Sequence, residues 1–126
     1  MSQRIIVADD NQDLRNSIVS ILTEEGYEVS QAENGREVLK LINSSEPYHL
    51  LITDLSMPDV EGLELIRTLT KSHPDLPIVA ISGSFEGRFL GVAEQFGVRG
   101  TLQKPFKRRP LLDLVNSALA TTSHIP

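Results

Sequence analysis

The sequence predicts an α/β fold in which helices cover both faces of a doubly wound, five-stranded parallel sheet. Short apolar runs alternate along the chain with stretches in which apolar residues recur at helical spacing, as expected of repeated strand–helix units. The clearest runs are Ile5 to Ala8, Leu50 to Thr53 and Ile78 to Ile81. These runs are continuous rather than alternating, which is typical of strands that are buried on both faces.

Two further strands complete the predicted sheet. Tyr27 to Ala32 is more polar than the other runs, so we expect it at an edge of the sheet. Gly100 to Gln103 is a weaker run, and it is assigned as a strand mainly because it stands between two helical patterns.

Five helices are expected between and after the strands. The first ends at Gly26, since glycine suits the backbone conformation that follows a helix C-terminus. Asn34-Gly35 opens the second helix, His73-Pro74 stops the third and Gly97 ends the fourth. The apolar residues at helical spacing are, helix by helix, Leu14, Ile18, Ile21 and Leu22; Val38, Leu39 and Ile42; Leu63, Leu65, Ile66 and Leu69; Phe89, Leu90, Val92, Ala93 and Phe96; and Leu111, Leu112, Val115 and Leu119.

Composition narrows the possible functions. The 126 residues suffice for one domain, which we expect to span residues 1–120, with residues 121–126 as a flexible tail or linker stub. Twelve Lys and Arg against seventeen Asp and Glu give a net charge of −5, which argues against direct nucleic-acid binding. Cysteine is absent, so disulfides and thiolate metal sites are excluded.

The start of the chain predicts a cytoplasmic protein without membrane contact. Met1 to Arg4 leads directly into the first apolar run, and two aspartates follow that run. The run is too short for the apolar region of a signal peptide or for a membrane span.

Polar residues follow four of the apolar runs, at the points where strands are expected to end. They are Asp9-Asp10, Asp54, Ser82 and Lys104-Pro105. Open parallel α/β sheets bind ligands beyond the carboxyl ends of their strands, so these residues should meet at one edge. Three carboxylates, a hydroxyl and an ammonium match a hydrophobic core poorly, but they suit a divalent metal and a phosphoryl group.

Each of these residues has an expected role. Asp10 and Asp54, with Asp9 and a nearby backbone carbonyl, offer the hard oxygen ligands that Mg²⁺ prefers. Asp54 is the candidate nucleophile for aspartyl phosphate formation. Lys104 supplies a compact cation for one phosphoryl oxygen, and Ser82 donates a hydrogen bond to another. The peptide bond before Pro105 is a candidate cis bond.

The sequence resembles the receiver domain of two-component response regulators from Arg4 to about Ala120. The residues that carry the resemblance are Val7-Ala8-Asp9-Asp10-Asn11, Asp54-Leu55-Ser56-Met57-Pro58-Asp59-Val60-Glu61-Gly62, Ile81-Ser82-Gly83 and Gln103-Lys104-Pro105-Phe106. Each piece alone is a weak signal, but the ordered set is specific. The resemblance implies the strand order 2-1-3-4-5 of CheY-like, flavodoxin-like sheets.

The resemblance also implies a mechanism. A histidine kinase or phosphotransfer protein is expected to give its phosphoryl group to Asp54, with Mg²⁺ bound by Asp10, Asp54 and the Ser56 carbonyl and with Asp9 acting through metal-bound water. Ser82 and Lys104 then close on the phosphoryl group and reshape the face made by helix four, strand five and helix five for a protein partner or a linked effector domain. Such a domain catalyses only its own phosphorylation and dephosphorylation, so it is not an enzyme in the usual sense.

One position departs from the family pattern, and two others leave the lifetime of the phosphoryl group open. Receivers commonly carry Tyr or Phe three residues before the lysine, where this chain has Thr101, so the aromatic part of the usual switch is in doubt. Ser56 and Ser84 occupy the positions that tend to tune the lifetime of the phosphoryl group, and neither residue indicates a long or a short lifetime.

Two local features suggest further hypotheses. Gly83, Gly87 and Gly91 lie in and around the start of helix four, which should make it the least stable helix, or else they pack closely against the sheet. The cations of Lys107 to Arg109 stand at the start of helix five, where the helix dipole disfavours them. They are either a contact for an acidic partner or solvated surface charge.

The same residues bear on three alternative functions. A degenerate receiver that serves as a phosphorylation-independent interaction module should lack the acceptor, the acid pair or the lysine, and none is missing. A phosphohydrolase with an aspartyl nucleophile usually has a second acid two residues on, where Ser56 stands here. A flavin or dinucleotide carrier is disfavoured because no Gly-x-Gly-x-x-Gly follows the first strand. Alone, Asp9-Asp10 would be read as a helix cap.

Overall fold

The computed structural model describes residues 3–44, 46–55, 62–83 and 90–123. Strands and helices alternate along these ranges, as the sequence predicts. They are β1 (Arg4–Ala8), α1 (Gln12–Glu24), β2 (Glu28–Ala32), α2 (Gly35–Ile42), β3 (Leu50–Asp54), α3 (Gly62–Ser72), β4 (Ile78–Ser82), α4 (Leu90–Gln95), β5 (Gly100–Gln103) and α5 (Arg108–Ser123). No helix within these ranges is long and apolar enough to cross a membrane.

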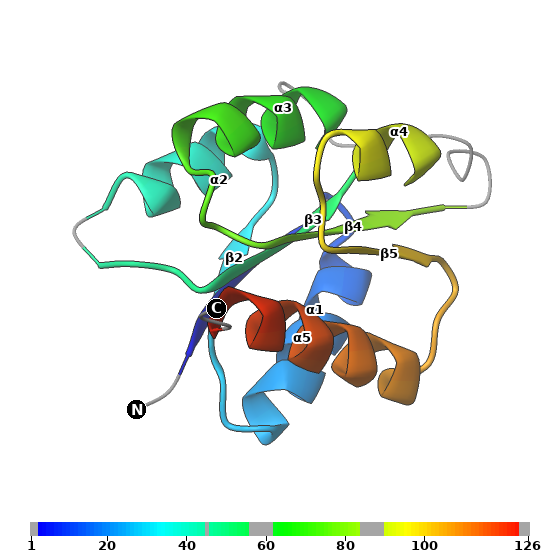
Figure 1. The fold of residues 1–126 in the computed structure, drawn as a ribbon. Coiled ribbons are helices and arrows are strands. Elements are labelled where there is room, and N and C mark those ends of the chain that lie inside the picture. The colour runs from blue at the N-terminus through cyan, green and yellow to red at the C-terminus, as the bar shows by residue number, and fades with distance from the viewer. Residues whose placement is uncertain (1–2, 45, 56–61, 84–89, 124–126) are drawn as a thin grey trace.

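The five strands form one parallel sheet in the order β2-β1-β3-β4-β5. Helices α2, α3 and α4 cover one face of this sheet and α1 and α5 cover the other (Figure 1). The doubly wound fold and the strand order are therefore confirmed, with β2 and β5 at the two edges.

The core has two halves, one on each face of the sheet. Side chains of β1 alternate between them: Ile6 and Ala8 pack under α2, α3 and α4, whereas Ile5 and Val7 pack against α1 and α5. Every residue of β3 and β4 is buried. This double coverage is the physical reason that the central strands read as unbroken apolar runs.

The helix boundaries follow local chemistry. The Asn34 side chain accepts a hydrogen bond from the Glu37 N–H at 2.9 Å and caps α2, as the sequence predicts. Gly26 and Gly97 have φ values of +94° and +99° after α1 and α4. At both glycines, two N–H groups after the helix bond back to carbonyls of its last turn, the pattern that glycine permits at low cost.

The last helix packs closely on the edge strand β5. A side chain at Gly100 would occupy the position of Leu114 of α5, so the glycine lets the helix approach the strand backbone. Helix α5 runs to Ser123, three residues into the segment that we expected to be a tail. Phe89, expected in the fourth helix, lies outside the described residues.

Candidate functional site

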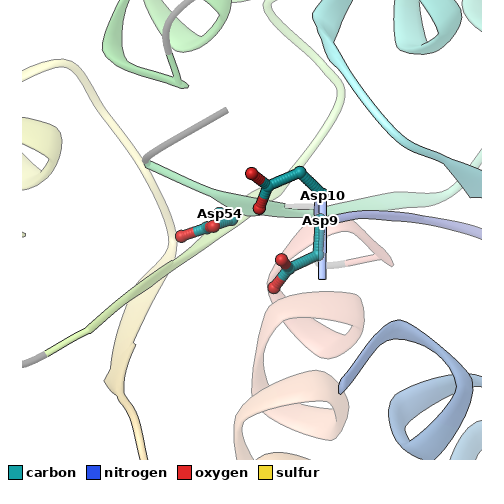
Figure 2. Close-up of side chains that lie close together, drawn as sticks. All are labelled: Asp9, Asp10 and Asp54. Carbon is teal, nitrogen blue, oxygen red and sulfur yellow. The ribbon is translucent and has the colours of Figure 1, made fainter. Parts of the chain in front are cut away.

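The carboxyl ends of four strands bring the expected site residues to one edge of the sheet. Asp9 and Asp10 follow β1, Asp54 is the last residue of β3, Ser82 is the last residue of β4, and Lys104 follows β5. One oxygen from each of the three aspartates lies within 4.8 Å of the others. Figure 2 shows these side chains gathered beyond the ends of β1 and β3.

The site combines buried charge with one open position. Asp9 is 1% exposed and Asp54 is 2% exposed, whereas Asp10 is exposed to solvent. Buried carboxylates are costly unless they are paired or bind a metal. The burial of Asp9 and Asp54 therefore requires nearby positive charge, and the exposed Asp10 leaves the site accessible from outside.

Lys104 supplies part of that positive charge. Its Nζ lies 3.2 Å from Oδ2 of Asp9 and 3.4 Å from Oδ2 of Asp54. Partial burial lowers the pKa of the Lys104 ammonium, but attraction to Asp54 and then to Asp9 outweighs this effect, so the pKa is raised above its ordinary value. One ammonium thus balances one of the three negative charges, and a divalent cation would balance the other two.

The two aspartates after β1 are not the cap of α1. The cap is Asn11, whose Oδ1 accepts a hydrogen bond from the Leu14 N–H at 3.1 Å. The Asn11 N–H in turn donates to Oδ1 of Asp9 at 2.9 Å. This geometry removes helix capping as the explanation of Asp9-Asp10 and leaves both carboxylates at the site.

The last residue of β4 is hydrogen-bonded to the backbone of the lysine. The Lys104 N–H donates to the Ser82 carbonyl at 2.7 Å, and the Lys104–Pro105 peptide bond is cis, as the sequence predicts. The Ser82 hydroxyl is buried and donates to the Gly83 carbonyl at 3.1 Å. Ser82 is therefore at the expected edge, with its hydroxyl hydrogen engaged locally.

Gly62, the first residue of α3, packs against the backbone at the end of β3. Its N–H donates to the Leu55 carbonyl at 3.2 Å, and a Cβ at this position would lie 2.5 Å from the Asp54 carbonyl oxygen. Glycine is needed because α3 starts directly against the backbone that carries Asp54. Ser56, the expected source of a carbonyl ligand, and Ser84 lie outside the described residues.

The sequence reasoning missed Arg15, a buried neighbour of the site. Arg15 is 6% exposed, and its Nη1 donates a hydrogen bond to the Asp9 carbonyl at 2.7 Å. Arg15 precedes Ile18 by three residues and Leu22 by seven, so helical spacing places it on the inward stripe of α1. That spacing was the available signal.

Thr101 occupies the position of the aromatic residue that is common in the family. It is half-buried in β5 and pairs with Ala80 of β4. Its neighbours Gly100 and Leu102 face α5, so the alternation of a strand turns Thr101 toward the α4 side.

One cation of the basic segment at the start of α5 is paired within the chain. Arg108 lies 2.7 Å from a carboxylate oxygen of Glu24 and 3.1 Å from one of Glu25, at the end of α1. Hydrogen bonds to these carboxylates raise the pKa of Arg108 above its ordinary value. Lys107 and Arg109 are exposed.

The donor set at the strand ends fits a divalent cation such as Mg²⁺. Three carboxylates supply hard oxygen atoms, and the cluster contains no soft ligand. Two of the carboxylates are buried, and Lys104 compensates their negative charge only in part. A bound cation would compensate the remaining charge.

The chain is similar in sequence to known receiver proteins and to part of a sensor kinase. CpdR of Brucella abortus, a response regulator receiver protein, is 33% identical over 117 residues, which cover 93% of this chain and 97% of CpdR. The autoinducer sensor kinase/phosphatase CqsS of Vibrio cholerae is 37% identical over 116 residues. This chain spans 17% of the length of CqsS, so that match concerns one part of a larger protein.

Solved structures and a family match agree with this result. The crystal structure of the receiver domain of NtrX from Brucella abortus superposes with a TM-score of 0.88 at 34% identity, over 93% of this chain and 98% of that one. A CheY-like receiver domain protein from Methanospirillum hungatei gives a TM-score of 0.89 at 29% identity, over 97% of each chain. Residues 5–116 match the family described as the response regulator receiver domain. The chain therefore belongs to the receiver domain family of two-component response regulators.

Proposed function

We propose that Asp54 is the phosphoacceptor of this receiver domain and that its donor is the phosphohistidine of a histidine kinase or phosphotransfer protein. The observation that carries the proposal is the setting of Asp54. Its carboxylate ends a central strand, lies 3.4 Å from the Lys104 ammonium, and has an oxygen within 4.8 Å of oxygens from Asp9 and Asp10. A nucleophilic carboxylate with a cation and a metal-ligand pair beside it is suited to phosphoryl transfer.

The transfer exchanges one bond to phosphorus for another. An oxygen of the Asp54 carboxylate attacks the phosphorus, the P–N bond of phosphohistidine breaks, and its electron pair stays on the ring nitrogen, which takes up a proton. The product is an aspartyl phosphate and a neutral histidine. The chain's own contribution is to hold the nucleophile and its neighbours in place before the donor arrives.

Asp10, Asp54 and the Ser56 carbonyl are the proposed direct ligands of Mg²⁺, with Asp9 acting mainly through metal-bound water. Bound there, Mg²⁺ would neutralise charge on the phosphoryl oxygens. Two of the three carboxylates are buried and the third is exposed, which supports a site that is preformed on one side and open on the other.

Lys104 and Ser82 are the proposed partners of the transferred group. The Lys104 ammonium already lies between Asp9 and Asp54, so a phosphoryl oxygen on Asp54 would come within its reach. The Ser82 hydroxyl donates to Gly83 and must turn to donate to a phosphoryl oxygen. That rotation of the Ser82 side chain would pull the connection after β4 inward. The inward movement would shift the conformational equilibrium of the face made by α4, β5 and α5.

The output of that face is proposed to be contact with a protein partner or a linked effector domain in the cytoplasm. The usual aromatic residue is replaced by the smaller Thr101, which is turned toward the α4 side. The switch in this chain is therefore proposed to depend on Ser82 and the backbone after β4 rather than on a swinging ring. The acceptor, acid pair and lysine are all present at one edge, so no observation favours a phosphorylation-independent module.

The test is the intact mass of the protein after incubation with Mg²⁺ and a small-molecule phosphodonor. We expect the mass of one phosphoryl group to be added to the wild-type chain, to be absent after chelation of the metal, and to be absent in Asp54→Asn. The decay of the adduct would give its lifetime. Absence of both the adduct and Mg²⁺ binding in the wild-type chain would contradict the proposal.

A further inference from the structure

Arg15 places a buried cation beside the candidate metal site. Its side chain is 7% exposed, and its partner in the ion pair is Glu33, which is 66% exposed and 3.9 Å away. A buried charge with so distant and solvated a partner is costly unless other groups hold it. The groups that hold it are the Asp9 carbonyl, 2.7 Å from Nη1, and the Gln31 side chain, 2.9 Å from Nε.

The Asp9 carbonyl belongs to the peptide group that joins the two aspartates. A hydrogen bond to this oxygen fixes the plane of that peptide and with it the direction in which the chain enters Asp10. The N–H of Asp9 is held separately by the Ala32 carbonyl at 3.1 Å. Arg15 therefore anchors the side of the turn that leads to Asp10.

The two aspartates differ in what else orients them. The Asp9 carboxylate is held by the Asn11 N–H and by Lys104. The Asp10 carboxylate is exposed, and no group in the described part of the chain donates a hydrogen bond to it. The orientation of the Asp10 carboxylate toward the other two carboxylates therefore depends on the backbone, which Arg15 fixes at the Asp9 carbonyl.

We propose that Arg15 is a positioning residue for the metal site: its guanidinium, held between the ends of β1 and β2, fixes the Asp9–Asp10 peptide and so aims Asp10 at the cation. This inference rests on the proposed function, in which the aspartates bind Mg²⁺. Groups that orient metal ligands from behind typically change metal affinity by about 10- to 100-fold when they are removed.

Positioning can be separated from charge because the two effects have opposite signs. Arg15 is a cation near the metal site, so removal of its charge alone would strengthen Mg²⁺ binding. Loss of the anchor would weaken binding. Arg15→Met removes both charge and anchor, whereas Arg15→Lys keeps the charge but loses the planar fork that reaches both the Asp9 carbonyl and Gln31.

The experiment measures the Mg²⁺ dissociation constant of the chain without phosphodonor. The chain has no tryptophan, so backbone amide shifts in an NMR titration with MgCl₂ serve as the signal. Arg36→Met is the matched control, because Arg36 is exposed on α2. Urea unfolding of each variant in a chelator reports any loss of fold separately.

We expect Arg15→Met to weaken Mg²⁺ binding by about tenfold or more, Arg15→Lys to weaken it by a smaller factor, and Arg36→Met to leave it unchanged. If Arg15→Met does not fold, Gln31→Met, which removes the exposed acceptor of Nε, should weaken binding in the same direction. Equal or tighter binding in the Arg15 variants, or in Gln31→Met, with a wild-type chain that binds Mg²⁺ would overturn the Arg15 proposal alone. A wild-type chain that binds no Mg²⁺ would overturn the proposed function.

Discussion

Replacing Lys104 with Met tests whether this lysine compensates the buried carboxylates of the site. The ammonium is 3.2 Å from Asp9 and 3.4 Å from Asp54, and its side chain is 24% exposed. At an effective dielectric constant of about 20, each of these pairs has an attraction of about 5 kcal/mol before desolvation is counted. Removing one partner of a buried ion pair costs about 3–5 kcal/mol, because the remaining charge stays buried without compensation.

We therefore expect Lys104→Met to lower the free energy of unfolding by about 3–5 kcal/mol in the presence of a chelator. Saturating Mg²⁺ should recover much of this loss, since a divalent cation would offset the same two carboxylates. The recovery should exceed the stabilisation that Mg²⁺ gives to the wild-type chain, because in the wild type Lys104 and the metal repel one another.

Urea unfolding followed by circular dichroism, with and without Mg²⁺, measures both effects. Lys107→Met is the control, since Lys107 is exposed three residues away and its loss should change stability by no more than about 0.5 kcal/mol. If Lys104→Met is as stable as the wild type in the chelator, or if Mg²⁺ stabilises it no more than the wild type, Lys104 does not compensate the buried carboxylates.

Three further outcomes follow from the structure. Gly62→Ala should lower the free energy of unfolding by about 3 kcal/mol, because its Cβ would meet the backbone at the end of β3. Gly91→Ala should raise it by up to about 1 kcal/mol, because no described residue lies within 4 Å of the added Cβ in α4. Equal effects of the two substitutions in urea unfolding would contradict this contrast. Stability should fall as pH rises above about 10, since the folded-state pKa values of Lys104 and Tyr27 are raised above 10.5 and 10.0, so the unfolded chain loses these protons first; unfolding midpoints that stay level from about pH 9 to 11 would contradict it. Asp54→Asn should lower the pKa of Lys104, because Asp54 gives the larger attraction; an unchanged pKa in an NMR titration of the lysine side chain would count against the ion pair.

The fold was predictable because several signals agree at each element. Unbroken apolar runs marked β1, β3 and β4, and the structure buries their side chains on both faces of the sheet. Asn34 and Gly26 marked helix ends through chemistry that the structure retains. The order of the strands in the sheet was predicted from the family resemblance, because the periodicity of the apolar runs does not determine it.

The strand-end residues of the site were predictable for a geometric reason. Parallel strands place their carboxyl ends at one edge, so residues far apart in sequence, such as Asp9 and Lys104, could be expected together. Hydrogen bonds that fix the backbone of the site residues are harder to predict, because they depend on the direction of each side chain. Arg15 appeared to be an ordinary helix residue, and the cap of α1 could have been Asp9 or Asp10 rather than Asn11.

The location of the phosphoryl group on the chain tests most directly whether Asp54 is the phosphoacceptor. After incubation with Mg²⁺ and a small phosphodonor, borohydride reduction converts an aspartyl phosphate to homoserine, which tandem mass spectrometry of peptides can assign to one residue. We expect homoserine at Asp54 in the wild-type chain and at no residue when the metal is chelated. Homoserine at another aspartate, or a phosphoryl group carried by a different kind of residue, would contradict it.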